Sequence, residues 1–227
     1  MPILDLLRHP LNRLRQRWGW EVTDREQVFD RIFRDNIWGD SDSASGTGSN
    51  LEQTRVLRTA LPALLERWHV RTMIDAPCGD FYWMSKTPLP VESYTGVDVV
   101  ESLVKRNEAL FGSPCRRFVR ADLVRDPIPR ADLVFCRDCL VHLSFSDAAR
   151  ALRNIRTSGA SLLLTTTFTE RQVNVDIRTG QWRPLNLCLP PFGFPPPVDV
   201  LVEHCTEDGG QYSDKSLGLW RLSDLPF

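Results

Sequence analysis

Beyond Val70, short apolar segments alternate with helical segments, and this alternation constrains the fold more than any other feature of the chain. Such an alternation implies βαβ crossovers, which produce a parallel sheet with helices on both faces. A long Pro-rich segment after Phe168 separates the last two strand candidates from the others. Strands are expected at Thr72–Ala76, Tyr94–Val99, Arg117–Ala121, Asp132–Cys136, Leu162–Thr167, Val198–Glu203 and Leu217–Leu222, and helices at about 100–111 and 145–156.

The first 49 residues differ from this pattern. In residues 1–20, Leu and Arg recur at spacings typical of a basic amphipathic helix, which packs on the protein or makes weak contact with an anionic membrane surface. Asp24–Ile37 follows helical spacing, whereas residues 39–49 consist of turn formers. We therefore expect residues 1–49 to form a helical cap with a loop, and residues 50–227 to form one α/β domain.

A capping-box pattern marks the start of the next expected helix. Ser49 and Glu52 have the S-x-x-E spacing in which each side chain can satisfy a backbone N–H of the other residue. The pattern predicts a helix from this point to about Trp68, kinked or split at Pro62.

Composition excludes several classes of protein. The chain has 227 residues, of which 42% are hydrophobic, and a net charge of −1, which is typical of one globular domain and unlike a nucleic-acid-binding protein. No apolar run reaches the roughly 18 residues of a membrane span, and no signal peptide is evident. Six scattered cysteines are typical of reduced thiols in the cytoplasm. The oligomeric state does not follow from the sequence.

Polar residues follow four of the expected strands. Ligands of open parallel sheets bind at the carboxyl ends of the strands, so these residues are the first candidates for a site. Asp75 and Gly79 follow the first strand, and Asp98 ends the second at the spacing expected for a ribose-binding acid. Asp122 follows the third strand, and the segment Cys136-Arg-Asp-Cys-Leu-Val-His142 follows the fourth. Simple turn formation is the alternative role for Asp75 and Asp122.

These segments together resemble the motif series of class I S-adenosylmethionine-dependent methyltransferases. The resemblance covers roughly residues 50–225 and implies a Rossmann-like, seven-stranded, mostly parallel sheet with an antiparallel last strand. In the glycine-rich loop the chain departs from the family pattern, because Pro77 and Phe81 replace two glycines and only Gly79 is retained. The wider pattern of Phe33-x-x-Asn36-x-Trp38-Gly39, Ser45-Gly-Thr-Gly-Ser49, Asp75-Ala-Pro-Cys-Gly-Asp-Phe-x-Trp83 and Cys136–Ser144 is similar to a small bacterial group associated with polysaccharide biosynthesis.

The resemblance implies S-adenosylmethionine as the cofactor. Asp98 would accept hydrogen bonds from both ribose hydroxyls, because a carboxylate has two suitably spaced oxygens. Asp122 would accept a hydrogen bond from the adenine amino group, and Leu123 would pack on the adenine ring. The loop 45–49 would act as a lid whose N–H groups hold the methionine carboxylate, the alternative being a flexible linker. The full set of expected cofactor-binding residues is Trp38, Ser45, Gly46, Gly48, Ser49, Asp75, Pro77, Cys78, Gly79, Asp98, Asp122, Leu123 and Arg137.

The candidate catalytic residues are His142 and Asp138, because an acceptor hydroxyl benefits from a base within hydrogen-bond reach. A structural role for His142 is nearly as well supported by the sequence. The spacing of Cys136, Cys139 and His142 suggests zinc, but a structural zinc needs a fourth ligand, so we expect packed thiols and no metal. Aromatic and planar polar groups suit a sugar, and the expected acceptor-binding residues are Trp83, Trp182, Arg183 and Asn186.

The function predicted from the sequence is methyl transfer from S-adenosylmethionine to a small-molecule or glycan-linked acceptor, with oxygen as the expected methylated atom. A non-catalytic module that binds the cofactor as a sensor is the alternative from another class. A nicotinamide-dependent oxidoreductase is disfavoured, because no G-x-G-x-x-G follows the first strand.

Overall fold

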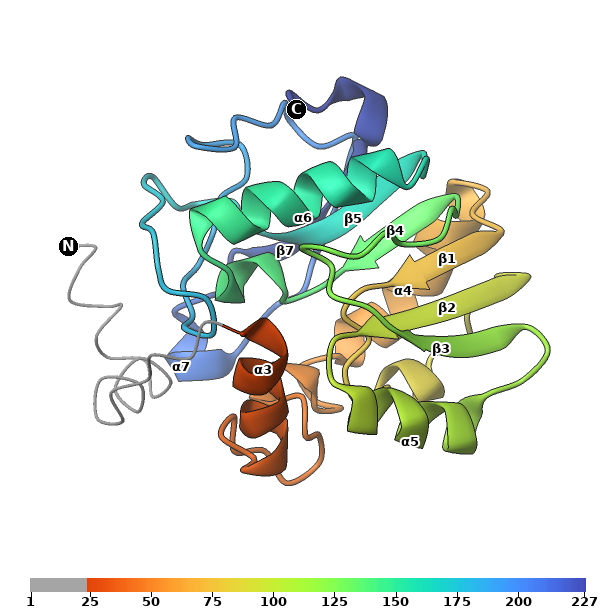
Figure 1. Cartoon of the computed structure of the whole chain (residues 1–227). Coiled ribbons are helices and arrows are strands. Elements are labelled where there is room, and N and C mark those ends of the chain that lie inside the picture. The colour runs from red at the N-terminus through yellow and green to blue at the C-terminus, as the bar shows by residue number, and fades with distance from the viewer. Residues whose placement is uncertain (1–23) are drawn as a thin grey trace.

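A computed structural model describes residues 24–227 of the chain, and its centre is a seven-stranded sheet (Figure 1). The strand order is β3-β2-β1-β4-β5-β7-β6. The order reverses direction between β1 and β4, which is the topological switch point where open parallel sheets bind ligands. The strands are β1 (Thr72–Asp75), β2 (Ser93–Asp98), β3 (Arg116–Arg120), β4 (Leu133–Cys136), β5 (Leu162–Phe168), β6 (Asp199–Val202) and β7 (Lys215–Arg221).

Strands β1 to β5 are parallel to one another, whereas β7 is antiparallel to both β5 and β6. This arrangement confirms the expected mostly parallel sheet with an antiparallel last strand. All seven expected strands are present, with ends that differ by one or two residues from the sequence-based ranges. Parallel pairing brings the carboxyl ends of β1, β2, β3 and β4 to one edge, and with them the acidic residues that follow these strands.

Helices cover both faces of the sheet (Figure 1). Leu61 of α4 and Val104 of α5 pack in one buried cluster with Met73, whereas Leu152 of α6 packs in another cluster with Ile74. Met73 and Ile74 are adjacent in β1, so successive side chains of this strand serve opposite faces. The helices are α3 (Arg25–Arg34), α4 (Arg55–Arg67), α5 (Glu101–Phe111), α6 (Phe145–Thr157) and the short α7 (Glu207–Gly210), and the 3-10 turns are η1 (Thr47–Ser49), η2 (Met84–Lys86), η3 (Leu140–His142) and η4 (Leu222–Asp224).

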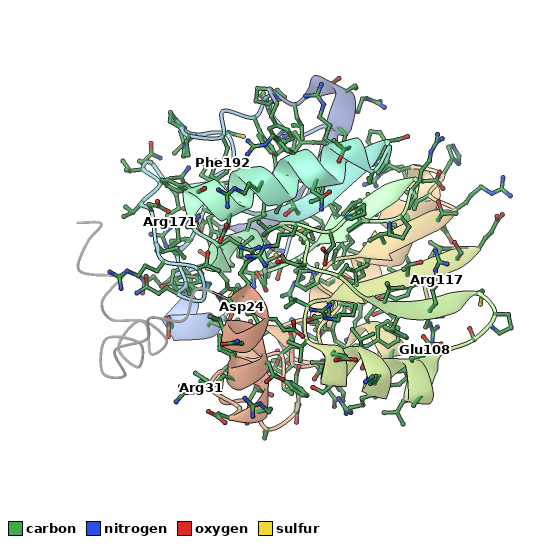
Figure 2. All side chains as sticks on the ribbon, in the orientation of Figure 1. Asp24, Arg31, Glu108, Arg117, Arg171 and Phe192 are labelled. Atoms are coloured by element: carbon green, nitrogen blue, oxygen red, sulfur yellow. The ribbon has the colours of Figure 1, made fainter. Side chains whose placement is uncertain are left out.

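Local hydrogen bonds explain where two of the helices begin. The Asp24 carboxylate, labelled in Figure 2, accepts a hydrogen bond from the Glu26 N–H and caps α3. The Ser144 hydroxyl accepts from the Asp147 N–H at 3.2 Å and caps α6, as its capping-box pattern indicates. Each cap satisfies one of the N–H groups that a helix leaves unpaired in its first turn.

The capping box expected at Ser49 is wrong. Ser49 ends the turn η1, and α4 begins only at Arg55. The neighbouring Asn50 makes the local hydrogen bond instead of Ser49: its side-chain oxygen accepts from the Gln53 N–H. This bond forms a turn and not the start of a helix. Pro62 lies inside α4 and does not split it.

The first helix of the described region also differs from expectation. It ends at Arg34, three residues before the expected Ile37, and a turn follows in which Asn36 has a left-handed backbone (φ 44°). The pattern in residues 1–20, and the membrane contact considered for it, lies outside the described residues. No helix within residues 24–227 is long and apolar enough to span a bilayer. The domain boundary expected at residue 49 stays a prediction.

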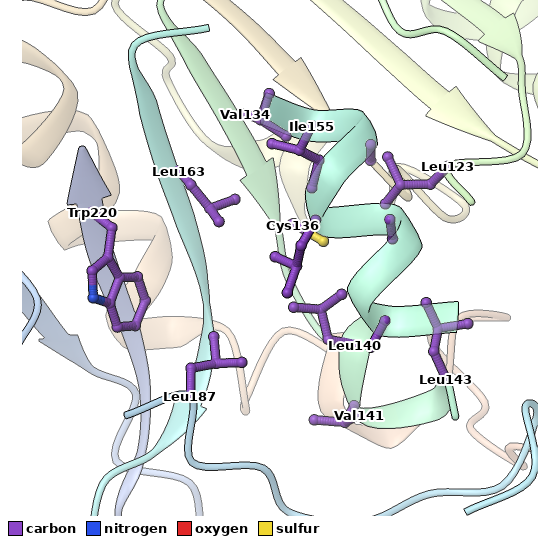
Figure 3. Close-up of a cluster of buried hydrophobic side chains, with 14 of the residues drawn as sticks. Leu123, Val134, Cys136, Leu140, Val141, Leu143, Ile155, Leu163, Leu187 and Trp220 are labelled. Atoms are coloured by element: carbon purple, nitrogen blue, oxygen red, sulfur yellow. The ribbon is translucent and has the colours of Figure 1, made fainter. Parts of the chain in front are cut away.

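The buried cluster under α6 is the core on which the site edge of the sheet is built (Figure 3). Val134 and Leu163 contribute from β4 and β5, and Trp220 contributes from β7. The Pro-rich segment 169–197 adds Leu187 to the same cluster, so this irregular segment is packed on the sheet. This packing places a segment without regular structure next to the site edge of the sheet.

We predict that Leu152→Ala lowers the free energy of unfolding by about 2–5 kcal/mol, because Leu152 is fully buried and its truncation leaves a cavity. Leu110→Ala is the matched control, since Leu110 is 61% exposed on α5 and its truncation should change stability by no more than about 0.5 kcal/mol. Urea unfolding followed by circular dichroism measures both values. Equal losses in the two variants would contradict the assignment of the core.

Candidate functional site

A cavity, here named the first cavity, opens at the carboxyl edge of the sheet next to the switch point between β1 and β4. Its walls come from the segments that follow β1, β2, β3 and β4, from α3 and from Ala44, Ser45 and Ser49. Asp75, Gly79, Asp98 and Asp122 all line it, so the structure brings together the residues that follow the first three strands.

The loop after β1 needs a glycine at position 79. Gly79 has φ +54°, and a Cβ atom there would lie 2.4 Å from the Ser45 hydroxyl oxygen. That oxygen accepts a hydrogen bond from the Asp80 N–H at 2.9 Å. The backbone of the loop after β1 therefore lies so close to the Ser45 side chain that position 79 has room for glycine alone.

Asp98 at the end of β2 is a buried carboxylate on the cavity wall. Its oxygens accept one backbone hydrogen bond each, from Gly79 N at 3.1 Å and from Val100 N at 3.0 Å. Burial raises the pKa of Asp98, and these two hydrogen bonds act in the opposite direction. Because a carboxylate can accept about four hydrogen bonds, Asp98 keeps acceptor capacity for a ligand.

Asp75 at the end of β1 is also buried beside the cavity. Burial raises the pKa of Asp75 to about 8, and the hydrogen bond that the Tyr94 hydroxyl donates to it acts in the opposite direction. Asp75 is therefore a carboxyl group whose ionisation responds to charge brought into the cavity.

Asp122 lines the first cavity, but its carboxylate is engaged by the cap helix. Arg25 of α3 donates to it through Nε and Nη2, with the shortest contact at 2.7 Å, and the Val124 N–H donates to it at 2.9 Å. Arg25 also pairs with Asp147 of α6 at 3.3 Å. This cluster attaches α3 to the sheet edge. The expected contact of Asp122 with adenine stays a prediction.

Residues 43–49 form an ordered bridge across the site. The Asp80 carboxylate accepts hydrogen bonds from the Ser43 hydroxyl at 2.9 Å and from the Ala44 N–H at 2.8 Å. Arg137 donates to the Gly48 carbonyl oxygen at 2.8 Å. These contacts hold the loop against the sheet edge, and its expected role as a lid over the cofactor stays a prediction.

A second cavity, so named here, lies on the other side of this loop. Trp38, Ser45, Ser49, Asp138 and His142 line both cavities and form the wall between them. The remaining lining residues of the second cavity are Ile37, Gly46, Thr47, Gly48, Phe168, Trp182, Cys205, Glu207, Asp208, Tyr212 and Lys215.

Asp138, whose side chain is 24% exposed, belongs to a group of four charges whose other three members are buried. Lys215 Nζ lies 2.7 Å from Asp138 Oδ2 and 3.6 Å from Glu203 Oε2, and Arg137 lies 3.2 Å from Asp138 and 2.7 Å from Glu203. Arg137 and Lys215 hold the pKa of Asp138 well below its usual range, against the opposing effect of burial. A carboxylate held ionised in this way is a poor proton acceptor near neutral pH.

His142 ends the turn η3 and lies in the wall between the cavities. Its Nδ1 is 3.0 Å from the Gln181 carbonyl oxygen, a contact in which the ring nitrogen must be the donor. In the neutral ring the proton is therefore on Nδ1 and the acceptor lone pair is on Nε2. The Trp38 ring packs on the imidazole with centroids 5.1 Å apart.

Most of the residues expected from the sequence line one of the two cavities. Trp83, expected on the acceptor side, lines the first cavity, and its ring lies 5.6 Å from the Arg137 guanidinium carbon. Gly46 and Gly48, expected at the cofactor, line the second cavity together with Trp182. The first cavity contains the other expected cofactor residues Trp38, Ser45, Ser49, Asp75, Pro77, Cys78, Gly79, Asp98, Asp122, Leu123 and Arg137.

Arg183 and Asn186 line neither cavity. Arg183 is buried and donates to the Leu140 carbonyl oxygen at 2.9 Å, so it supports the turn that presents His142. Asn186 bonds to backbone groups of the Pro-rich segment, among them the Arg171 carbonyl oxygen. These bonds serve local structure, whereas Arg183 Nε and Nη2 have no hydrogen-bond partner among the described residues. The expected role of both residues in acceptor binding stays a prediction.

Several site residues were missed by sequence reasoning. Arg25, Asp80, Glu203, Glu207 and Lys215 act through partners far away in the sequence, and no local spacing indicates them. Cys136 is buried in the core, and Cys139 lines the first cavity. Among residues 24–227, no three His, Cys, Asp or Glu side chains come together as a metal site would require.

Comparison with solved structures identifies the fold. The methyltransferase domain of a bacterial Hen1 superposes with a TM-score of 0.53 and 16% identity, over 76% of this chain and 100% of that domain. This likeness shows that the chain has the fold of methyltransferases, as the sequence motifs led us to expect. No family model and no curated protein matches the chain.

Two other similar structures contain the cofactor or its product. The N-methyltransferase NodS from Bradyrhizobium japonicum WM9 in complex with S-adenosyl-L-homocysteine has a TM-score of 0.49 and 17% identity, over 63% of this chain and 73% of that chain. Human N-acetylserotonin methyltransferase in complex with S-adenosylmethionine has a TM-score of 0.48 and 18% identity, over 80% of this chain and 55% of that chain.

We predict that the stability of the protein falls between about pH 4 and about pH 8 in a manner that depends on Asp75. In this range the folded state retains a proton on Asp75 that the unfolded state has released, so the free energy of unfolding decreases by up to about 1.4 kcal/mol per pH unit. Asp75→Asn should lack this decrease. Urea unfolding of both proteins at about pH 5 and about pH 8 measures it, and equal differences between the two pH values would contradict the prediction.

Proposed function

We propose that the protein transfers a methyl group from S-adenosylmethionine in the first cavity to a small-molecule acceptor in the second cavity. The position of Asp98 is the observation that carries the proposal: it is a buried carboxylate with spare acceptor capacity, at the end of β2 and next to the switch point. A methyltransferase fold with a ribose-type acid at this point supports a nucleoside-containing cofactor.

The residues of the first cavity fit such a cofactor. Asp98 would accept hydrogen bonds from the two ribose hydroxyls, and Leu123 offers an apolar surface for adenine. The indole N–H of Trp38 is buried and has no hydrogen-bond partner among the described residues, so it can donate to a polar group of a ligand. Gly79 brings backbone to the cavity where a side chain would clash.

When bound, S-adenosylmethionine supplies an electrophilic methyl group on a positively charged sulfur. The residues of the protein then have three tasks: to align the acceptor with that methyl group, to exclude water and to accept a proton. Alignment alone corresponds to effective molarities of roughly 10⁵ M or more. The bridge of residues 43–49 and Trp38 separates the two cavities and limits the access of water to the wall between them.

His142 is the proposed proton acceptor. Its Nδ1–H is donated to the Gln181 carbonyl oxygen, so Nε2 has the lone pair, and the ring lies in the wall shared by the two cavities. Asp138, the second candidate from the sequence, instead pairs with Lys215 and Arg137 and helps to position the wall. An oxygen acceptor and a glycan-linked substrate stay predictions from the sequence.

A sensor that binds the cofactor without catalysis is the second candidate function. It would need the first cavity but not His142 or the second cavity. The position of the imidazole in the wall shared by the two cavities favours the enzyme, because a binding module gains nothing from this arrangement.

We predict that Asp98→Asn weakens the binding of S-adenosylmethionine by about 10- to 150-fold, which corresponds to about 1.5–3 kcal/mol for the loss of a charged acceptor. Asn keeps an oxygen for one of the two backbone contacts, and circular dichroism checks that the fold persists. Asp224→Asn, on the exposed η4, is the matched control and should bind like the original protein. Isothermal titration calorimetry measures the dissociation constants, and an unchanged value for Asp98→Asn would refute the ribose contact.

We predict that His142→Gln lowers the rate of methyl transfer by about 10²- to 10⁴-fold, because the general base is lost. The dissociation constant of S-adenosylhomocysteine should change little, since His142 is not assigned to cofactor binding. An acceptor found by screening small molecules with a methyl-labelled donor provides the assay. A variant that retains the rate within about threefold would show that no imidazole base is used.

A further inference from the structure

Helix α3 presents a stripe of three side chains to the first cavity. Arg25, Phe29 and Phe33 are spaced four residues apart, so they lie along one face of the helix. All three line the first cavity. The stripe spans about 12 Å, because a helix rises about 1.5 Å per residue. The cap helix therefore forms one wall of the cavity.

Ion pairs fix the first turn of α3 at the end of β3. Arg25 donates to Asp122, which follows β3, and Arg120 at the end of β3 donates to Glu26. Arg25 also pairs with Asp147 in the first turn of α6 at 3.3 Å. The side chains of Arg25 and Asp122 are 9% and 13% exposed, so water and salt screen this pair little. The start of the stripe is therefore held at the β3 side of the cavity.

The order of the strands indicates which part of the cofactor lies at this side. The sulfur of S-adenosylmethionine must reach the wall shared with the second cavity, to which Asp138 contributes just after β4. Asp98, proposed to bind the ribose, ends β2. The base and the sulfur are attached at opposite ends of the ribose. Because the strand order is β3-β2-β1-β4, the base extends from Asp98 toward β3 and meets the start of α3.

The side chains at the β3 side suit a flat, apolar base. Leu123 and Val124 follow β3, Leu103 comes from α5, and all three line the first cavity. Phe29 packs against the buried cluster that contains Leu123 and Val124, so its ring adjoins this apolar part of the cavity. Aromatic side chains bind nucleic acid bases by packing on their flat faces.

The Asp122 carboxylate is occupied by groups of the protein. It accepts three contacts from the Arg25 guanidinium and one from the Val124 N–H. A carboxylate can accept about four hydrogen bonds, so these contacts use its capacity. Asp122 thus supports α3, and recognition of the base falls to the apolar side chains around it.

We propose that α3 forms the adenine wall of the cofactor site, with Phe29 packing on the base and Arg25 holding the helix in place. The inference rests on the proposed function and adds the residues that bind the base. The ligand class of this wall is an adenine nucleoside, with or without the methionine part. Adenosine should therefore bind to the same wall as S-adenosylhomocysteine.

Adenosine and S-adenosylhomocysteine together test the contact with the base. Their dissociation constants are measured with the full chain at neutral pH, by ligand-observed NMR for adenosine and by calorimetry for S-adenosylhomocysteine. We expect Phe29→Ala to weaken the binding of both ligands by a similar factor, about 5- to 150-fold, because both contain the base. Nuclear Overhauser effects should connect the C2 and C8 protons of adenosine with the Phe29 ring.

Phe29→Leu separates binding from packing. It keeps most of the apolar volume, so its stability should stay close to that of the original protein, whereas its affinity for both ligands should still fall at least about threefold. Phe227→Ala is the matched control, because Phe227 packs against the same buried cluster and lines neither cavity. Both dissociation constants should stay within about twofold in this control.

Arg25→Met tests the role of Asp122. Loss of the ion pair should release α3 and weaken the binding of adenosine about as much as Phe29→Ala does. Tighter binding of adenosine by Arg25→Met would show that the freed Asp122 carboxylate binds the base, and it would overturn the role of Arg25.

The outcomes distinguish this inference from the proposed function. If the original protein binds both ligands and the two Phe29 variants bind them equally well, the adenine wall is refuted and the proposed function stands. A loss confined to S-adenosylhomocysteine would place Phe29 at the methionine part and would also refute the adenine wall. If the original protein binds no S-adenosylhomocysteine, the proposed function and this inference are refuted together.

Discussion

The group of four charges formed by Arg137, Asp138, Glu203 and Lys215 holds the site together. They come from the ends of β4 and β6 and from the start of β7, and the side chains of Arg137, Glu203 and Lys215 are at most 6% exposed. Two positive and two negative charges balance, which offsets the cost of removing them from water. Removal of one partner would leave an unpaired buried charge, at a cost of about 3–5 kcal/mol. The antiparallel strands β6 and β7 are thus joined to the parallel half of the sheet by charge as well as by pairing.

The same group of charges determines where the two cavities are separated. Arg137 donates to the Gly48 carbonyl oxygen, and Asp138 faces the second cavity beside Lys215. The loop 43–49 therefore rests on a rigid, charge-balanced base, and Asp80 holds its other end. In this arrangement His142 is the proposed proton acceptor, while Asp138 is paired with Lys215 and Arg137.

The sheet could be predicted from the sequence, because strands buried on both faces leave apolar runs and parallel pairing needs helical crossovers. Asp75 and Asp98 could be predicted as site residues for the same reason, since they end expected strands. The pairing of Arg25 with Asp122 could not, because it joins residues 97 positions apart through tertiary packing. Local spacing also misplaced the start of α4, where Asn50 forms a turn that competes with the capping box at Ser49.

A crystal structure of the protein grown with S-adenosylhomocysteine tests the central claim most directly. The account predicts the ligand in the first cavity, with both ribose hydroxyls donating to the Asp98 carboxylate and the sulfur directed toward the wall formed by Trp38 and His142. A ligand that lies outside this cavity, or whose ribose makes no contact with Asp98, would contradict it.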